Sequence, residues 1–302
     1  MEGGIDIVIN YYNPKGSERL LVQTLLCVAC YVESTVPMRI FLADGSGLVN
    51  EQLQAKHNGH SFFYLPSIRP LGFAEGYNSG IKAASQYSDN KMIALSANDI
   101  FVAPLTLHYL LATLESSPAI GCAIPYLSYS DFFAQRDVVY PRARQMGYMT
   151  LNLNLFRKED LVAIGMVPEY LSGYFNDLVM GLELAKQGKQ IMLCHAGKVN
   201  HLHRSTTTTS TLASYSGDRE AFFARYPAYR PANDKVPLRL SLLEKQTMPR
   251  LLLQLWEQSW AGTIHGLLQR AEKAYYAIEK VLYQRIYYPI YKNLKDPYAH
   301  MD

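Results

Sequence analysis

Two aspartates that each follow an apolar run could act together in one site. Asp44 ends the stretch MRIFLAD, and Asp99 ends the stretch KMIALSAND. If both runs are strands of one open α/β sheet, both carboxylates lie at its carboxyl edge, where such sheets bind ligands. A single aspartate there is often only a turn former, but two on one sheet favour a site. One could hold a nucleoside, and the other could hold Mg²⁺ or Mn²⁺ bridging a diphosphate.

A glycine-rich run, LGFAEGYNSGIKAA at residues 71–84, lies between these aspartates. Its spacing is G-x-x-x-G-x-x-x-G after the third apolar run, whereas a dinucleotide site requires G-x-G-x-x-G after the first. The sequence also has no G-x-x-x-x-G-K-[ST] loop. These patterns exclude dinucleotide-binding and P-loop sites. We expect Gly76 and Gly80 to form a helix face that packs closely on a sheet.

Strand-like and helical patterns alternate in the elements that must position these residues. The apolar runs predict strands at 5–12, 38–44, 61–65, 91–99 and 119–127, and helices at 17–34, 75–86 and 105–115. A strand, two helices and a final strand are expected between 151 and 194. This alternation of strands and helices predicts an α/β fold with a mainly parallel, doubly wound sheet.

The composition is that of a globular protein of 302 residues, with 49% hydrophobic and 18% charged residues. The net charge of +3 is too small to indicate a nucleic-acid partner. The first residues lack the pattern of a secretory signal, and no apolar segment is long enough to span a membrane. We therefore expect a cytoplasmic protein, with contact to the inner face of the membrane left open.

An ordered set of short motifs resembles the family 2 glycosyltransferases, and most of all their rhamnosyltransferase-like branch. The resemblance covers about residues 5–230, and each motif is degenerate by itself. The motifs in chain order are VINYYN, LADGSG, LGFAEGYNSGI, LSANDIFVAP, YFNDLVMGLELAKQGKQ and VNHLHRS. The resemblance implies a GT-A fold with a mainly parallel, Rossmann-like sheet. It also implies a nucleotide-diphospho-sugar donor, a divalent cation, Mg²⁺ or Mn²⁺, and inversion at the anomeric carbon.

The resemblance also assigns roles near the donor. Asn13 and Asp44 fall where the family contacts the nucleoside. Gly72, Phe73 and Asn78 match the segment beside the nucleotide, with Asn78 expected to face the ligand. The acceptor would be a hydroxyl of a glycan or lipid-linked sugar, as in the synthesis of bacterial surface polysaccharides.

The metal-binding motif is only partly retained. Asp99 matches the last acid of the family's DXD triplet, but the first acid is replaced by Ala97. Asn98 stands between them and is assigned to donor binding. His201 matches the histidine that closes the site and can join the metal, so metal binding would rest on Asp99, the donor diphosphate and His201. The alternative for His201 is a polar loop residue with no ligand role.

The catalytic base implied by the resemblance is Asp177, the second acid of the family's ED pair, which is Asn176-Asp177 here. It would deprotonate the acceptor hydroxyl as that oxygen attacks the sugar. Its alternative role is a helix N-cap, and the two roles can coexist. Further candidates for contact with the acceptor or diphosphate are Asn176, His203, Arg204 and Arg69.

The region from 237 to 302 differs from the rest, because Leu, Trp and Tyr alternate with Lys and Arg in an amphipathic helical pattern. We expect a catalytic domain at 1–236 and a helical region at 237–302. Two interpretations of that region stay open: a helical cap that forms a homodimer, or a helix lying at an anionic membrane surface.

Two other functions fit parts of the sequence. A non-catalytic glycan-binding or scaffold protein on the same fold would explain the missing first acid of the triplet. A sugar nucleotidyltransferase would need a Gly-rich, basic signature after the first strand, which NYYNPKGSERL resembles poorly.

Overall fold

The computed structural model describes residues 4–34, 36–127, 144–146, 149–201 and 214–230. The chain divides into two units, Met1–Pro227 and Ala228–Asp302, and all the described strands belong to the first. The expected helical region at 237–302 lies outside the described residues, so the domain boundary at 236 stays a prediction. Among the described residues, no helix is both long and apolar enough to cross a membrane.

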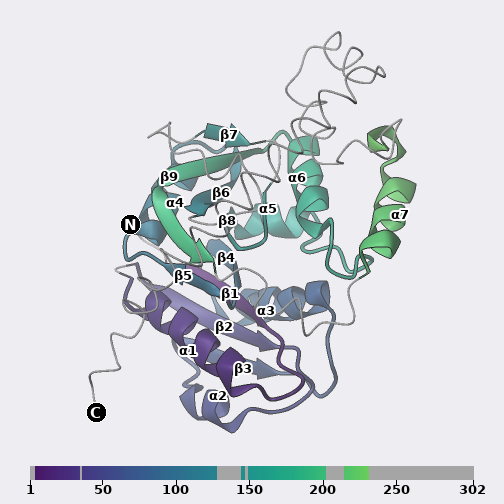
Figure 1. Cartoon of the computed structure of the whole chain (residues 1–302). Coiled ribbons are helices and arrows are strands. Elements are labelled where there is room, and N and C mark those ends of the chain that lie inside the picture. Colours follow the sequence, from purple (N-terminus) through teal and green to yellow (C-terminus); the bar gives the residue numbers. More distant parts are fainter. Residues whose placement is uncertain (1–3, 35, 128–143, 147–148, 202–213, 231–302) are drawn as a thin grey trace, which may run out of the picture. The chain divides into compact units, whose positions relative to one another are not determined.

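Strands and helices alternate through the first half of the chain, as the apolar runs predict (Figure 1). The strands are β1 (Ile5–Tyr11), β2 (Met38–Asp44), β3 (Phe62–Pro66), β4 (Met92–Ala97), β5 (Ile100–Val102), β6 (Ile120–Leu127), β7 (Arg144–Met146), β8 (Leu153–Arg157) and β9 (Gln190–His201). The helices are α1 (Glu18–Val32), α2 (Glu51–Lys56), α3 (Phe73–Tyr87), α4 (Thr106–Glu115), α5 (Lys158–Ala163), α6 (Asn176–Lys186) and α7 (Tyr215–Arg225), followed by the 3₁₀ turn η2 (Pro227–Tyr229).

Within the described residues the strands form one sheet in the order β3-β2-β1-β4-β8-β6-β9-β5, with β7 added beside β9. The pairs among β3, β2, β1 and β4 are all parallel. Strand β8 is antiparallel to both β4 and β6, and β9 is parallel to β6. Because two reversals restore the direction, β9 runs the same way as β1 and β4. The carboxyl ends of these strands therefore lie toward one edge.

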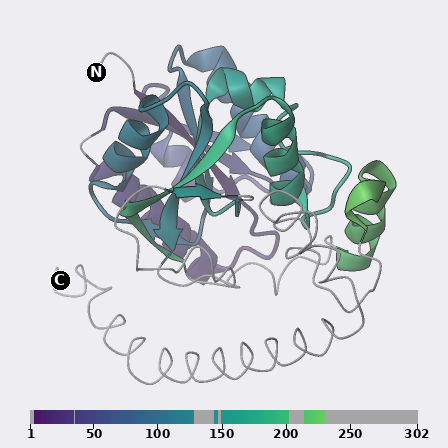
Figure 2. The same cartoon turned by 90° about the horizontal axis from the view of Figure 1, so that it is seen from above.

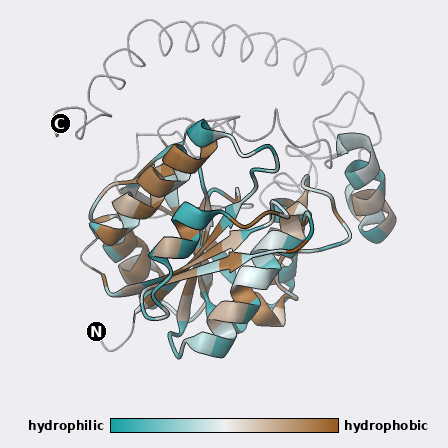
Figure 3. Cartoon of the chain, turned by 90° about the horizontal axis from the view of Figure 1, so that it is seen from below, coloured by the Kyte–Doolittle hydropathy of each residue, from teal (hydrophilic) through white to brown (hydrophobic). Residues whose placement is uncertain are grey.

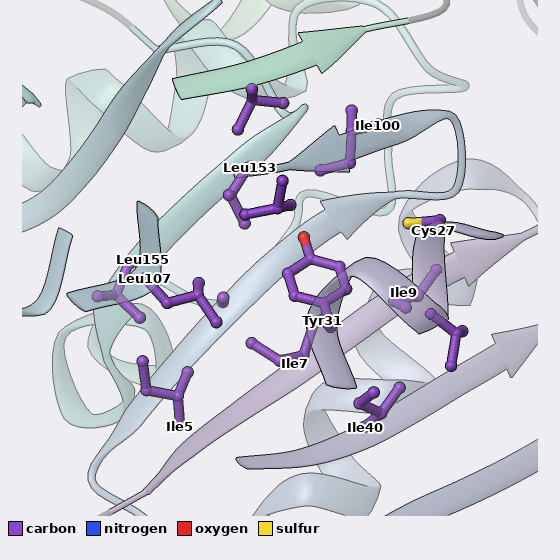
Figure 4. Packing of buried hydrophobic residues seen from close by; sticks show 14 of the residues in the cluster. Ile5, Ile7, Ile9, Cys27, Tyr31, Ile40, Ile100, Leu107, Leu153 and Leu155 are labelled. Carbon is purple, nitrogen blue, oxygen red and sulfur yellow. The ribbon is translucent and has the colours of Figure 1, made fainter. Parts of the chain in front are cut away.

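Helices cover both faces of the sheet, because side chains alternate between the two faces along each strand. Ile5, Ile7 and Ile9 of β1 pack in one cluster with residues of α1 and α4, including Tyr31 (Figure 4). Val8 of β1 points the other way and packs in a second cluster with residues of α3, α5 and α6. In Figure 3 the strands between these helical layers are mainly brown, the colour of hydrophobic residues. The result is a three-layer α/β/α arrangement.

Helix α3 packs closely on the sheet, as expected from its glycines. A Cβ atom at Gly76 would overlap the Oδ1 atom of Asn10, and one at Gly80 would overlap a methyl group of Val8. Both partners belong to β1. The absence of these two side chains therefore brings the start of α3 against the centre of the sheet.

A buried ion pair lies at the amino end of β1. Asp6 is fully buried and accepts a hydrogen bond from the Nζ atom of Lys158 at 2.7 Å. The same carboxylate also accepts from the Ser88 hydroxyl and the Asn90 amide. These contacts join the first strand to the start of α5 at the edge opposite the candidate site.

Candidate active site

The nucleoside side of the candidate site is built on the end of β2. Asp44 is 1% exposed and lies in register with Tyr11, the last residue of β1. Its Oδ1 atom accepts from the Ser46 backbone N–H at 2.9 Å, and its Oδ2 atom accepts from the Tyr64 hydroxyl at 2.6 Å. Burial, followed by the hydrogen bond to Asp44, raises the pKa of Tyr64, so this phenol stays a donor. A carboxylate can accept about four hydrogen bonds, so Asp44 keeps capacity for a ligand.

Asn13 is buried beside Asp44, and its side chain holds the β1–α1 loop. Its amide nitrogen donates to the Tyr11 hydroxyl at 2.8 Å and to the Ser17 carbonyl at 2.9 Å, and its Oδ1 atom accepts from the Ser17 N–H. Its backbone N–H donates to the Ser46 hydroxyl at 2.7 Å. The loop residue predicted to contact the nucleoside is thus fixed directly against the Asp44 turn.

The glycine-rich run begins α3 at the same edge. Gly72 is the N-cap residue of α3, and its N–H donates to Glu75 at 2.9 Å. The Phe73 carbonyl accepts from the Asn10 amide at 3.1 Å, which ties the helix start to β1. The guanidinium of Arg69 donates two hydrogen bonds to the Glu75 carboxylate, at 2.8 and 3.2 Å. That contact, followed by the Gly72 N–H, lowers the pKa of Glu75 to about 2.

Two asparagines assigned to the donor have their amides in contact with protein groups. Asn78 donates to the Val167 carbonyl and to Glu169, both at 2.8 Å, and accepts from the Val167 N–H at 3.0 Å. Asn98 donates to the Thr24 hydroxyl of α1 at 3.0 Å. These contacts anchor neighbouring segments, and the donor-binding role of each residue stays a prediction.

Asp99 lies in a two-residue turn between β4 and β5, where the apolar pattern predicted one strand over 91–99. Strand β5 reverses there and pairs antiparallel with the end of β9, which places Ile100 opposite His201. As a result, the Nε2 atom of His201 lies 3.3 Å from the Oδ1 atom of Asp99. The two side chains are 12% and 6% exposed, respectively.

The Asp99–His201 pair fits a divalent cation. Carboxylate oxygen and imidazole nitrogen are both ligands for Mn²⁺ and related ions. Neighbouring ligands on an octahedral ion with bonds of about 2.1 Å lie about 3 Å apart, close to the separation found here. In the part of the chain that the structure describes, no group of three or more His, Cys, Asp or Glu side chains could hold a metal ion. The donor diphosphate is the expected source of further ligands.

Asp177 lies in the first turn of α6, and its Oδ1 atom accepts from the Leu178 N–H at 2.9 Å. Helix α6 leads through Gly188, at a φ of +70°, into β9. A helix that packs on the strand it precedes runs opposite to that strand. The first turn of α6 therefore lies toward the edge where β9 ends at His201. The adjacent Asn176 is 1% exposed and donates to the Pro168 carbonyl at 2.9 Å.

Two residues important to this edge have no signal in the sequence motifs. Tyr64, in β3, is the hydroxyl partner of Asp44. Asp218, in α7, accepts hydrogen bonds from the loop that precedes Asp177. Tyr64 could have been suggested as a site residue by its position, because it is an aromatic residue two positions before the end of β3. Two other assigned residues, His203 and Arg204, lie outside the described residues.

No protein-family model and no curated protein matches this chain in sequence. Solved structures that match it at a TM-score of 0.55 include the following. GalNAc-T7 with UDP, GalNAc and Mn²⁺ is 13% identical, over 81% of this chain and 54% of that protein. TarS 1–349 of S. aureus with UDP-GlcNAc is 11% identical, over 80% and 71%. The mannosyltransferase PcManGT of Pyrobaculum calidifontis with GDP-Man and Mn²⁺ is 13% identical, over 97% and 84%.

These structures confirm the expected fold: the described chain has the GT-A fold. It spans about half the length of GalNAc-T7. Assignment to family 2 and to its rhamnosyltransferase-like branch stays a prediction.

Proposed function

We propose that this protein transfers a sugar from a nucleotide-diphospho-sugar to a hydroxyl of a glycan or lipid-linked acceptor, with inversion at the anomeric carbon. One observation carries the proposal. On a GT-A fold, three groups lie toward the same edge of the sheet: Asp44, the Asp99–His201 pair and the first turn of α6, with Asp177. We place this transfer in the synthesis of a surface polysaccharide.

Asp177 is the proposed general base. Asp177 lies in the first turn of α6, near the positive end of the helix dipole, and a carboxyl group must be ionised to accept a proton as a general base. The hydrogen bond from the Leu178 N–H orients the carboxylate of Asp177 at the start of α6. Removing the proton of the acceptor hydroxyl makes the sugar oxygen a better nucleophile as it attacks the anomeric carbon.

Asp44 and Asn13 are the proposed contacts of the nucleoside, and the Asp99–His201 pair the proposed contact of the diphosphate. The four hydrogen bonds of the Asn13 backbone and side chain fix the β1–α1 loop before the donor arrives. Such preorganisation lowers the cost of binding. When bound, Mg²⁺ or Mn²⁺ supplies positive charge that offsets the charge of the departing nucleoside diphosphate.

The test measures release of nucleoside diphosphate from a panel of donors that includes UDP-GlcNAc, UDP-GalNAc and GDP-mannose. We expect one member to be turned over, and we expect Asp177→Asn to lower its kcat by about 10²–10⁴-fold while its Kd stays within twofold. Glu51→Gln is the matched control, because Glu51 is an exposed carboxylate in the first turn of α2.

Donor binding without turnover of any donor would favour a non-catalytic binding protein. Full activity of Asp177→Asn would remove Asp177 as the base. Formation of a nucleotide-sugar from a sugar phosphate would indicate a nucleotidyltransferase.

A further inference from the structure

A second aspartate, Asp218, binds the backbone of the loop that precedes Asp177. It lies in the first turn of α7 and is 4% exposed. Its Oδ1 atom accepts from the Ser172 N–H at 2.7 Å. Its Oδ2 atom accepts from the Gly173 and Tyr174 N–H groups at 3.0 and 2.8 Å. Three consecutive backbone N–H groups thus converge on one carboxylate, in the manner of an anion-binding nest.

The side chain of Ser172 adds two hydrogen bonds between the loop and the start of α7. Its hydroxyl donates to the Oδ2 atom of Asp218 at 2.9 Å and accepts from the Ser214 N–H at 2.8 Å. The Ser214 hydroxyl in turn accepts from the Gly217 N–H, which caps α7. The start of α7 and the loop before α6 are therefore joined by a continuous set of hydrogen bonds.

Phe175 makes a third connection, and its backbone is strained. It adopts a left-handed conformation, with a φ of +66°, which costs a non-glycine residue about 1–3 kcal/mol. Its side chain is 7% exposed, and its ring lies 5.4 Å from Phe222 and 5.3 Å from Tyr215, both of α7. Phe175 is the N-cap residue of α6 but makes no side-chain capping bond.

These contacts connect α7 to the segment that immediately precedes α6. The last loop residue that Asp218 holds, Tyr174, lies three positions before Asp177. Phe175 lies two positions before it. Helix α7 lies outside the two helical layers of the sheet, on the outer side of α6 (Figures 1 and 2). Its position is therefore set largely by these contacts and by the Tyr226–Glu183 hydrogen bond at its end.

We propose that Asp218 is a positioning residue for Asp177: by binding the 172–174 backbone it sets the direction of the first turn of α6. The proposal rests on the proposed function of Asp177 as the base. Asp218 itself touches the loop and no reacting atom. Neutralising Asp218 leaves Asp177 in the sequence but weakens the contacts that position it. A displacement of a catalytic group by about 1 Å can lower the rate by about 10²-fold.

The experiment compares Asp218→Asn with the unchanged chain, using the donor of the panel that releases nucleoside diphosphate fastest. We expect kcat to fall by about 10–100-fold, with KM and Kd for the donor within twofold. Hydrogen exchange at residues 172–174 should accelerate while that of β1 and β4 stays the same. Glu220→Gln is the matched control, because this carboxylate on the same helix is 60% exposed; its kcat should stay within twofold.

A double variant separates positioning from general loss of structure. If Asp218 acts through Asp177, adding Asp218→Asn to Asp177→Asn should lower the residual rate by less than twofold. A further fall of 10-fold or more would overturn the proposal. So would an Asp218→Asn enzyme with full kcat.

If Asp218→Asn does not fold, Ser172→Ala tests the same connection more gently, since it removes one hydroxyl and leaves the backbone donors in place. It should lower kcat by about 3–10-fold in the enzyme and have no effect in the Asp177→Asn background. An Asp177→Asn enzyme of full activity contradicts the proposed role of Asp177 as the base, whereas an inactive Asp177→Asn enzyme beside a fully active Asp218→Asn enzyme contradicts this inference alone.

Discussion

The two sides of the candidate site are positioned in different ways. On the nucleoside side, parallel strands end in register, and Asp44, Asn13 and Ser46 bond mainly to residues of the same two loops. On the side of the proposed chemistry, Asp99 meets His201 through the short antiparallel pair of β5 and β9. Asp177 follows a strained residue that packs on α7.

The difference suggests a division of tasks. A site built from parallel strand ends is rigid, because each polar group is held by neighbours that the sheet already fixes. A site assembled from distant segments depends on packing between them, so substitutions far from the reacting atoms can alter it. Changes on the first side should therefore affect donor binding, and changes on the second should affect turnover.

After Asp177→Asn, the largest effect is expected at Asp99. In Asp99→Asn the pair with His201 loses its charge, so we expect kcat to fall by about 10²–10³-fold and the metal concentration needed for half-maximal rate to rise. A chelator should stop the unchanged enzyme, and added Mn²⁺ or Mg²⁺ should restore it. Steady-state rates over a metal titration provide the measurement.

Asp44→Asn is the counterpart on the nucleoside side. Losing a charge-assisted hydrogen bond of about 1.5–3 kcal/mol should raise the donor Kd by about 10–100-fold, with kcat little changed. If both variants altered kcat and Kd alike, the division between the two sides would not hold. An enzyme that worked equally well in chelator would remove the metal from the proposal.

The next effect concerns stability alone. Gly80→Ala should destabilise the fold by about 1–3 kcal/mol, because its Cβ would meet the short, branched side chain of Val8 in β1. Gly76→Ala should cost less, since the Asn10 side chain can turn away and give up its bond to Phe73. Urea unfolding measures both.

Gly72→Ala is the matched control on the same helix. Its Cβ would lie 3.6 Å from Glu75, an ordinary contact, so the cost should stay below about 1 kcal/mol. Equal losses for Gly72→Ala and Gly80→Ala would contradict close packing of α3 on the sheet.

The smallest effect is expected from Arg69→Gln. The hydrogen bond from Arg69 lowers the pKa of Glu75 to about 2, so the pair stabilises the fold above pH 4.5, the ordinary value, and this contribution is lost as the pH falls toward 2. The side chains are 61% and 36% exposed, so solvent screens the pair and the difference in unfolding free energy at pH 7 should be small. Unfolding free energies at pH 7 and pH 2 should show a difference that disappears in acid.

The sequence predicted the first half of the fold well, because β1, β2 and β4 are apolar runs with clear turns between them. It also predicted the close packing of Gly76 and Gly80. It did not predict β5, because a three-residue strand has no period of its own and forms only when β9 lies beside it.

The candidate site was harder to predict where its contacts are distant. The strand-end position of Asp44 is visible in the sequence, but its Tyr64 partner depends on the register of β2 with β3. The contacts of Asp218 are backbone N–H groups more than 40 residues earlier, and a backbone group has no residue type to recognise. Only the folded chain shows that α7 contacts the loop before Asp177.

The Asp6–Lys158 pair has a consequence for how the chain folds. Its partners are 152 residues apart, and Asp6 is fully buried at the beginning of the first strand. Until α5 arrives, the parallel half of the sheet would enclose a carboxylate without its cation, and breaking such a pair costs about 3–5 kcal/mol. We therefore expect that the parallel half does not fold as an independent module. The two halves should unfold in a single cooperative transition, and a fragment that ends before β8 should lack a stable native state.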